Sequence, residues 1–222
     1  MREQIQQNEV AIPIGSQRLS GELVTVSNAV VIFAHGSGSS RHSPRNQYVA
    51  RVLHEAGLGT LLFDLLTPGE EEAEYFTHHL RFNIELLAER LDGATDWLKT
   101  QETSYKLRIG YFGSSTGGAA ALVAAAKLGE QLGAVVSRGG RPDLAVPYLH
   151  QVKAATLLIV GANDTPVIEM NEEAYKHLGC DKELRLIPGA SHLFEEEGAL
   201  ETVARLAAEW FQRHLKPEGS QR

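Results

Sequence analysis

The stretch from Arg108 to Leu122, RIGYFGSSTGGAAAL, constrains this chain more than any other part of its sequence. An apolar run rich in β-forming residues ends in Gly-Ser-Ser-Thr-Gly, and an alanine-rich helical pattern begins at once. Gly113, Ser115 and Gly117 match the G-x-S-x-G pattern, in which a serine stands at the tip of a tight strand-to-helix turn. Glycines are needed where the chain passes close to itself, and the helix aims its first N–H groups above the serine. The stretch predicts a nucleophilic serine, with a glycine-rich turn without chemistry as the plain alternative.

Strand and helix patterns alternate along most of the rest of the chain. Continuous apolar runs of strand length predict strands that are covered on both faces, as in a parallel sheet flanked by helices. We expect an antiparallel hairpin at 10–14 and 19–26, and further strands at 29–34, 60–64, 134–137, 156–160 and 184–187. The expected helices are 48–55, 81–100, 169–178 and 200–215, and the acidic segment 70–74 is expected to be a solvated loop.

Length and composition narrow the class of protein. A chain of 222 residues is expected to form one domain, 1–222, with 216–222 as a flexible tail. The formal net charge of −7 argues against a general nucleic-acid binder. No apolar run approaches the length of a membrane span, and residues 1–8 lack the apolar region of a signal peptide. We therefore expect a cytoplasmic protein with neither nucleic acid nor membrane as a partner; the sequence leaves its oligomeric state open.

Two further candidate residues follow strand ends, in the chain order Ser115, Asp164, His192. An isolated aspartate in a loop is usually a turn former, and an isolated histidine is usually solvated, but together with the serine they reproduce a hydrolase order. A serine hydroxyl needs a base, and the histidine can take its proton and return it to the leaving group. The aspartate would orient the imidazole. Asp143, which also follows a strand end, is the alternative acid.

The same chemistry needs two N–H donors for the oxyanion that forms on the acyl carbon. One is expected to be the backbone N–H of Thr116, directly after the nucleophile. The other is expected to come from the turn after the 29–34 strand, at the backbone N–H of Ser37. His35, in the same turn, is expected to brace the loop rather than to react.

Four segments together resemble the α/β-hydrolase superfamily, and most of all its compact, dienelactone-hydrolase-like branch. They are His35-Gly36-Ser37-Gly38, Gly113 to Gly117, Gly161-Ala162-Asn163-Asp164 and Gly189-Ala190-Ser191-His192. The resemblance implies an α/β fold with a mostly parallel eight-stranded sheet and helices on both faces. Dienelactone hydrolases use cysteine at the elbow, where this chain has Ser115, which argues against that particular lactonase activity. The segment 137–152 is too short for a cap domain, so the site is expected to be shallow or open.

Two arginines, Arg138 and Arg141, follow the strand after the elbow and are candidates for binding a substrate carboxylate or phosphate. Pairing with nearby acidic residues such as Asp143 is the alternative for both. Arg41, His42 and Arg45, after the oxyanion turn, are candidates for a second basic rim.

The sequence therefore predicts a serine hydrolase that acts on a small-molecule carboxylic ester or thioester, with no metal or organic cofactor. Acyl transfer to an acceptor other than water uses the same residues and stays open. A catalytically silent binding protein that keeps the fold is the third alternative.

Overall fold

The computed structural model describes residues 6–101 and 107–215, and the tail expected at 216–222 lies outside them. The strands are β1 (Gln6–Ile14), β2 (Gln17–Thr25), β3 (Ala29–Ala34), β4 (Gly59–Phe63), β5 (Arg108–Ser114), β6 (Ala134–Arg138), β7 (Ala155–Gly161) and β8 (Lys182–Ile187). The α-helices are α1 (Pro44–Glu55), α2 (Pro68–Thr77), α3 (Ile84–Lys99), α4 (Thr116–Leu128), α5 (Thr165–His177) and α6 (Ala199–His214). Shorter 3₁₀ segments are η1 (Leu80–Phe82), η2 (Gly129–Gln131) and η3 (Pro142–Gln151).

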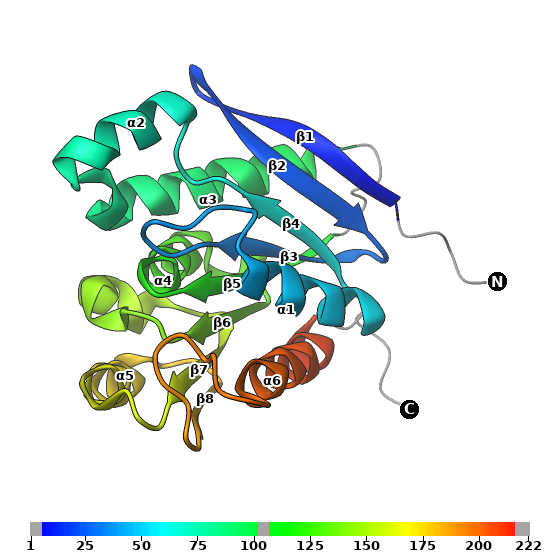
Figure 1. Ribbon diagram of the computed structural model, residues 1–222. Helices are drawn as coiled ribbons and strands as arrows, with labels where there is room; N and C mark the ends of the chain where they lie inside the picture. The colour runs from blue at the N-terminus through cyan, green and yellow to red at the C-terminus, as the bar shows by residue number, and fades with distance from the viewer. Residues whose placement is uncertain (1–5, 102–106, 216–222) are drawn as a thin grey trace.

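The eight strands form one sheet in the order β1-β2-β4-β3-β5-β6-β7-β8 (Figure 1). β1 and β2 form the expected antiparallel hairpin at one edge, and β2 also pairs antiparallel with β4. All the other neighbouring strands are parallel. The expected fold class, a mostly parallel eight-stranded sheet, is therefore confirmed.

Helices cover both faces of this sheet (Figure 1). α1 and α6 pack on one face, and α3, α4 and α5 lie on the other. Each face of the sheet has its own hydrophobic core, and alternate residues of β3 pack into one or the other. Val30 and Ile32 belong to the core under α3 and α4, and Val31 and Phe33 belong to the core under α1 and α6. Because a strand alternates its side chains, burial on both faces explains why β3 has no polar residue at all.

One segment differs in kind from what the sequence analysis expected. The acidic segment at 70–74 is part of helix α2 rather than a loop. Its N-terminus is a capping box, in which the Thr67 hydroxyl accepts the N–H of Glu70 at 3.2 Å and the Glu70 carboxylate accepts the N–H of Thr67 at 2.7 Å. Thr67-Pro68-Gly69-Glu70 is the usual sequence signal for such a start.

The parallel strands place their carboxyl ends along one edge of the sheet, and ligand sites in open α/β sheets lie at this edge. The residues singled out as candidates for chemistry lie at the carboxyl ends of β3, β5, β6, β7 and β8 or in the segments that follow them. Between β6 and β7 the chain forms only η3, so no cap domain arises from that connection. Within the described residues, no helix combines the length and apolar character needed to cross a membrane.

Candidate active site

Ser115 lies at the predicted elbow, between the end of β5 and the start of α4. Its backbone has φ 51° and ψ −122°, a conformation that non-glycine residues rarely adopt. The flanking glycines are required by close backbone contacts. A Cβ on Gly113 would lie 2.5 Å from the Gly117 carbonyl oxygen, and a Cβ on Gly117 would lie 2.2 Å from the Ala34 carbonyl oxygen. The strained serine and its two glycines are therefore one local structure.

Neighbouring loops fix the backbone of Ser115 on both sides. Its N–H donates to the Arg138 carbonyl at 3.3 Å, and its own carbonyl accepts the N–H of Arg141 at 3.1 Å. Gly36 lies against it as well, because a Cβ there would lie 3.1 Å from the Ser115 Cβ. The loop after β6 and the turn after β3 thus border the half-buried serine.

Asp164 and His192 meet at the ends of β7 and β8. The His192 Nδ1–H donates to Asp164 Oδ2 over 2.7 Å, with the carboxylate side chain 15% exposed and the imidazole side chain 40% exposed. This bond places the ring proton on Nδ1, so Nε2 carries a lone pair and can act as a base.

The two loops are held together by their own backbones. A Cβ on Gly161 would lie 2.4 Å from the Ala190 carbonyl oxygen, so only glycine allows this approach. The N–H of Asn163 donates to Ala190 O at 2.9 Å, and its side-chain amide donates to Gly189 O at 2.8 Å. The Gly161-Ala162-Asn163-Asp164 segment therefore positions the acid and the histidine loop together.

The alternative acid, Asp143, has a different partner. It accepts two hydrogen bonds from Arg141, at 2.9 and 2.8 Å, and no described residue links it to His192. The structure thus brings Asp164 to the histidine and leaves Asp143 in a local ion pair at the start of η3.

Ser115 and His192 border the same loop, but within the part of the chain that the structure describes their side chains share no hydrogen bond. The loop that contains Gly139 connects the two residues through backbone contacts. It follows Arg138, which accepts the N–H of Ser115, and a Cβ on Gly139 would lie 3.3 Å from the His192 carbonyl oxygen and 3.5 Å from its Cε1. Such gaps are common in enzymes without a bound substrate.

The two expected oxyanion donors are also brought together, with one difference. Thr116 is the first residue of α4, where backbone N–H groups have no partner within the helix. The N–H of Ser37, however, already donates to the Thr116 hydroxyl at 3.1 Å, and the two hydroxyl oxygens are 3.0 Å apart. This donor is therefore engaged in the resting protein, which the sequence did not predict.

His35 has the bracing role expected of it. Its Nδ1–H donates to Gly36 O at 3.0 Å, and its Nε2 accepts the N–H of Leu65 at 3.0 Å. Burial lowers the pKa of this histidine, so the ring stays neutral and fixes the oxyanion turn to the chain after β4.

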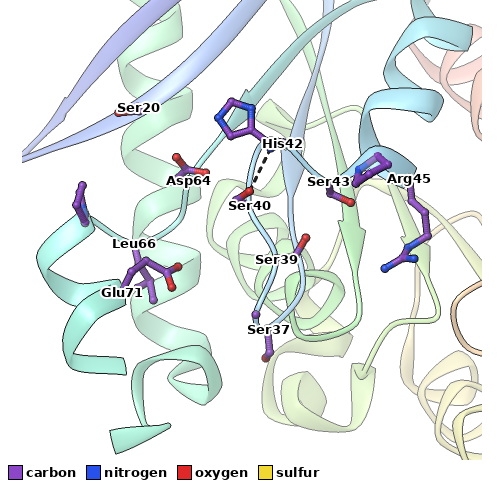
Figure 2. Close-up of a pocket in the computed structure, with 13 residues that line it drawn as sticks. Ser20, Ser37, Ser39, Ser40, His42, Ser43, Arg45, Asp64, Leu66 and Glu71 are labelled. Carbon is purple, nitrogen blue, oxygen red and sulfur yellow. Dashed lines mark hydrogen bonds between the residues drawn. The ribbon is translucent and has the colours of Figure 1, made fainter. Parts of the chain in front are cut away.

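A pocket of about 650 Å³, lined by several serines, adjoins this turn (Figure 2). Ser37, Ser39, Ser40 and His42 follow one another along its wall, and Asp64 faces them from the end of β4. Ser37 belongs both to this pocket and to the expected oxyanion turn, so the pocket adjoins the site without containing the serine, aspartate or histidine of the candidate triad.

The arginines fall into two groups. Arg41 forms an ion pair with Asp64, and Arg45 Nη1 lies 3.1 Å from Glu195 Oε1, so neither arginine of the expected second rim lacks an acid. Arg138 differs from these and from Arg141. It is buried, and its Nε and Nη1 have no hydrogen-bond partner among the described residues.

The sequence analysis named Gly36 within the oxyanion turn, and it lies against Ser115. It missed two residues that shape the site: Gly139 lies against His192, and Phe194 places its ring centroid 5.8 Å from the Arg138 guanidinium. Gly139 follows a strand end, which is a usable signal. Phe194 has φ 56° and is fully buried, and nothing in its local sequence indicates either property.

Comparisons with known proteins bear on the family and the fold of the chain. Residues 23–216 match the model of the dienelactone hydrolase family. The crystal structure of a dienelactone hydrolase from Anabaena variabilis is 59% identical, with a TM-score of 0.94, and the match covers 96% of this chain and 100% of that one. Est1E from Butyrivibrio proteoclasticus is 16% identical, with a TM-score of 0.76 over 93% of this chain and 98% of its own, and shares the fold alone.

A relative from Mycobacterium tuberculosis has a different name, "Putative phosphoribosyl transferase". It is 52% identical over 213 residues, which make up 95% of this chain but 47% of that protein. The chain therefore spans about half the length of the curated relatives that it matches.

Proposed function

The chain belongs to the dienelactone hydrolase family, and on that premise we propose that it is a serine hydrolase that cleaves carboxylic esters or thioesters. One observation carries the proposal: Ser115 stands on a strained elbow beside the Asp164–His192 pair, whose carboxylate and imidazole are 2.7 Å apart. A residue in such a backbone conformation lowers the stability of the fold, and residues of this kind are concentrated at functional sites.

In the proposed reaction, Ser115 Oγ attacks the acyl carbon while His192 Nε2 takes its proton. The proton transfer needs Ser115 Oγ and His192 Nε2 within hydrogen-bonding distance, and a rotation of the serine or imidazole side chain when substrate binds would bring them together. Asp164 stabilises the imidazolium that results. The oxyanion on the former carbonyl is stabilised by backbone N–H groups, from Thr116 and, once it leaves the Thr116 hydroxyl, from Ser37.

Collapse of this intermediate breaks the bond to the leaving alcohol or thiol, which receives the proton from His192. An acyl-enzyme on Ser115 remains. Water then attacks the acyl carbon with His192 again as the base, and the carboxylic acid leaves as the serine is regenerated. No step uses a metal or an organic cofactor.

Acyl transfer remains the second candidate, because an alcohol or amine can replace water in the last step. Nothing among the described residues favours it over hydrolysis. Phosphoribosyl transfer is not proposed, because that name belongs to proteins about twice as long as this chain and because such a reaction would leave the Ser115 elbow without a role.

The test labels the protein with a fluorophosphonate and measures kcat/KM for p-nitrophenyl acetate. We expect the adduct on Ser115, and we expect Ser115→Ala to lower kcat/KM by about 10⁴-fold or more. Ser27→Ala, at the amino edge of the sheet, is the control and should retain full activity. An adduct on Ser114 or Ser37, or an active Ser115→Ala protein, would overturn the assignment. A native protein that hydrolyses no ester and takes no label would support a silent binding role.

A further inference from the structure

Asn171, on α5, is a polar side chain with no exposed surface. The buried positions of this helix are Val167, Asn171 and Ala174, and the middle one alone is polar. Burying an amide lowers stability unless its polar atoms are paired, and the Oδ1 of Asn171 is buried without a hydrogen bond from any described residue. A leucine has the same branched shape and no such cost, so packing alone does not account for an asparagine here.

The amide nitrogen of Asn171 joins two separate parts of the chain. Its Nδ2 group donates to the Val167 carbonyl of its own helix at 2.8 Å and to the Gly140 carbonyl at 3.1 Å. Gly140 is the middle residue of the short segment between β6 and η3, residues 139–141, which we call the 139–141 loop. The second hydrogen bond therefore ties this loop to α5.

The 139–141 loop contacts both the nucleophile and the base. The N–H of Arg141 donates to the Ser115 carbonyl at 3.1 Å. At the other end of the loop, Gly139 lies against His192, because a Cβ there would lie 3.3 Å from the histidine carbonyl oxygen and 3.5 Å from its Cε1. The position of the loop therefore bears on the distance between the two reacting side chains.

The same loop rests on the first turn of α4. A Cβ on Gly118 would lie 3.0 Å from Gly140 Cα, and a Cβ on Gly140 would lie 1.9 Å from Ser137 Oγ. This turn begins with Thr116, whose backbone N–H is the expected oxyanion donor. With contacts this close, a displacement of Gly140 would also displace the turn that holds this donor.

The helix that holds Asn171 follows directly after the acid. The Asp164 carbonyl accepts the N–H groups of Val167 and Ile168 at 3.0 and 2.9 Å, so the start of α5 is fixed to Asp164. Asn171 stands about two helical turns further along the same helix. One buried amide thus connects the helix that follows the acid to the loop that contacts the serine and the histidine.

We propose that Asn171 is a positioning residue for the hydrolase reaction, on which proposal this inference rests. Its hydrogen bond to the Gly140 carbonyl holds the 139–141 loop where Ser115 and His192 can approach each other, and it acts through the loop without contact to the substrate. Misplacing reacting groups by about 1 Å can cost about a hundredfold in rate. The loss of this hydrogen bond should therefore be visible in kcat.

Two substitutions separate the hydrogen bond to Gly140 from the packing of α5. Asn171→Ser keeps a hydroxyl that can donate to the Val167 carbonyl but is too short to reach Gly140. Asn171→Leu keeps the branched shape and donates to neither. Both should lower kcat for p-nitrophenyl acetate about ten- to a hundredfold and change KM by less than about threefold. The rate at which a fluorophosphonate labels Ser115 should fall by a similar factor.

Trp210→Phe is the matched control. The buried Trp210 Nε1–H also joins a helix to a backbone carbonyl, that of Ala155 at 3.1 Å, but at the amino end of β7. This variant should lose stability while its kcat stays within about twofold of native protein. All variants are measured at a temperature at which circular dichroism shows folded protein, so a purely structural role at position 171 would likewise leave kcat unchanged.

Amide hydrogen exchange of the peptide that contains residues 139–141 gives a readout that does not depend on turnover. Exchange should be faster in Asn171→Ser and Asn171→Leu than in native protein, and unchanged in Trp210→Phe. Native exchange, or native kcat, in either folded Asn171 variant would overturn the positioning role. If only one of the two variants folds, the same criteria apply to it. A native protein that hydrolyses no ester and takes no label would instead contradict the hydrolase proposal itself, and the positioning role with it.

Discussion

Two segments at the carboxyl edge of the sheet each contain an aspartate shortly after the end of a strand, and the two aspartates have different kinds of partner. Asp164, after β7, accepts a hydrogen bond from His192, which lies 28 residues away in sequence. Asp143, after β6, accepts two hydrogen bonds from Arg141, only two residues away. Both aspartates therefore follow a strand end, and they differ in which hydrogen-bond donor lies nearest: an imidazole for Asp164 and a guanidinium for Asp143.

The difference shows that a carboxylate bound by a neighbouring arginine is not available to orient the histidine. Arg141 stands close enough in sequence to bind Asp143 with both edges of its planar group, whereas the chain near Asp164 offers no such cation. Asp164 is left for the residue that the parallel pairing of β7 and β8 brings to it.

Replacing each aspartate by asparagine tests this comparison with the largest expected effect. Asp164→Asn removes the acceptor that fixes the His192 tautomer and should lower kcat/KM for p-nitrophenyl acetate by about 10⁴-fold, the cost of the same change in a known triad. Asp143→Asn should stay within severalfold of native protein. Circular dichroism establishes that both variants are folded, and the reverse ranking of the two activities would make Asp143 the acid.

A third carboxylate, Asp92 on α3, extends the comparison to stability. Its Oδ1 is buried without a hydrogen-bond donor among the described residues, and burial raises its pKa to about 6. Between about pH 4 and pH 6 the unfolded chain has lost this proton while the folded protein keeps it. Stability therefore falls as the pH rises through this window, and the loss is complete above it.

Asp92→Asn should consequently raise the free energy of unfolding at pH 7 by about 1 kcal/mol, a value reduced for the partial exposure of the group. At pH 3.5, where the carboxyl is protonated in the folded protein and mostly protonated in the unfolded chain, the variant and native protein should differ little in stability. Urea denaturation at the two pH values measures the difference. A gain of equal size at both would mean that the charge of Asp92 is not its cause.

The smallest effect is expected for the Arg141–Asp143 pair. Both side chains are about one-third exposed, at 33% and 31%, and surface ion pairs contribute about 0.5 kcal/mol. Arg141→Gln should thus lower the free energy of unfolding by about that amount and leave kcat/KM nearly unchanged. A double-mutant cycle with Asp143→Asn isolates the coupling between them. A large loss of activity in Arg141→Gln alone would give this arginine a role in the site.

The sheet and the elbow that carries Ser115 could be predicted because their signals are local. β3 was expected at 29–34 and is observed at Ala29–Ala34, since its apolar run is bounded by polar residues and a glycine turn. The elbow follows from Gly113 and Gly117, which no larger residue could replace. Helices α1 and α5 begin earlier than expected, at Pro44 and Thr165, because each has a proline in its first turn, where the missing N–H is not needed and the fixed φ suits a helix.

Contacts between distant segments could not be predicted in this way. The burial of Arg138 depends on α1 and on Phe194, and the occupied N–H of Ser37 depends on a hydroxyl 79 residues away. Helix α2 is a different case. Its capping box at Thr67 and Glu70 is written in the sequence, but the run of glutamates suggested a solvated loop.

The hydrogen bond from the Ser37 N–H to the Thr116 hydroxyl bears on how the site distinguishes a bound ester from its reacting form. An incoming carbonyl oxygen must displace that hydroxyl, and two neutral acceptors differ little in strength, so the exchange gains almost nothing for the intact ester. A tetrahedral oxyanion is charged and accepts roughly twice as strongly. On the proposed mechanism, the Thr116 hydroxyl therefore competes for the Ser37 N–H, and only the charged oxygen forms a stronger hydrogen bond than the hydroxyl it displaces. An interaction that is stronger in the transition state than in the ground state lowers the barrier.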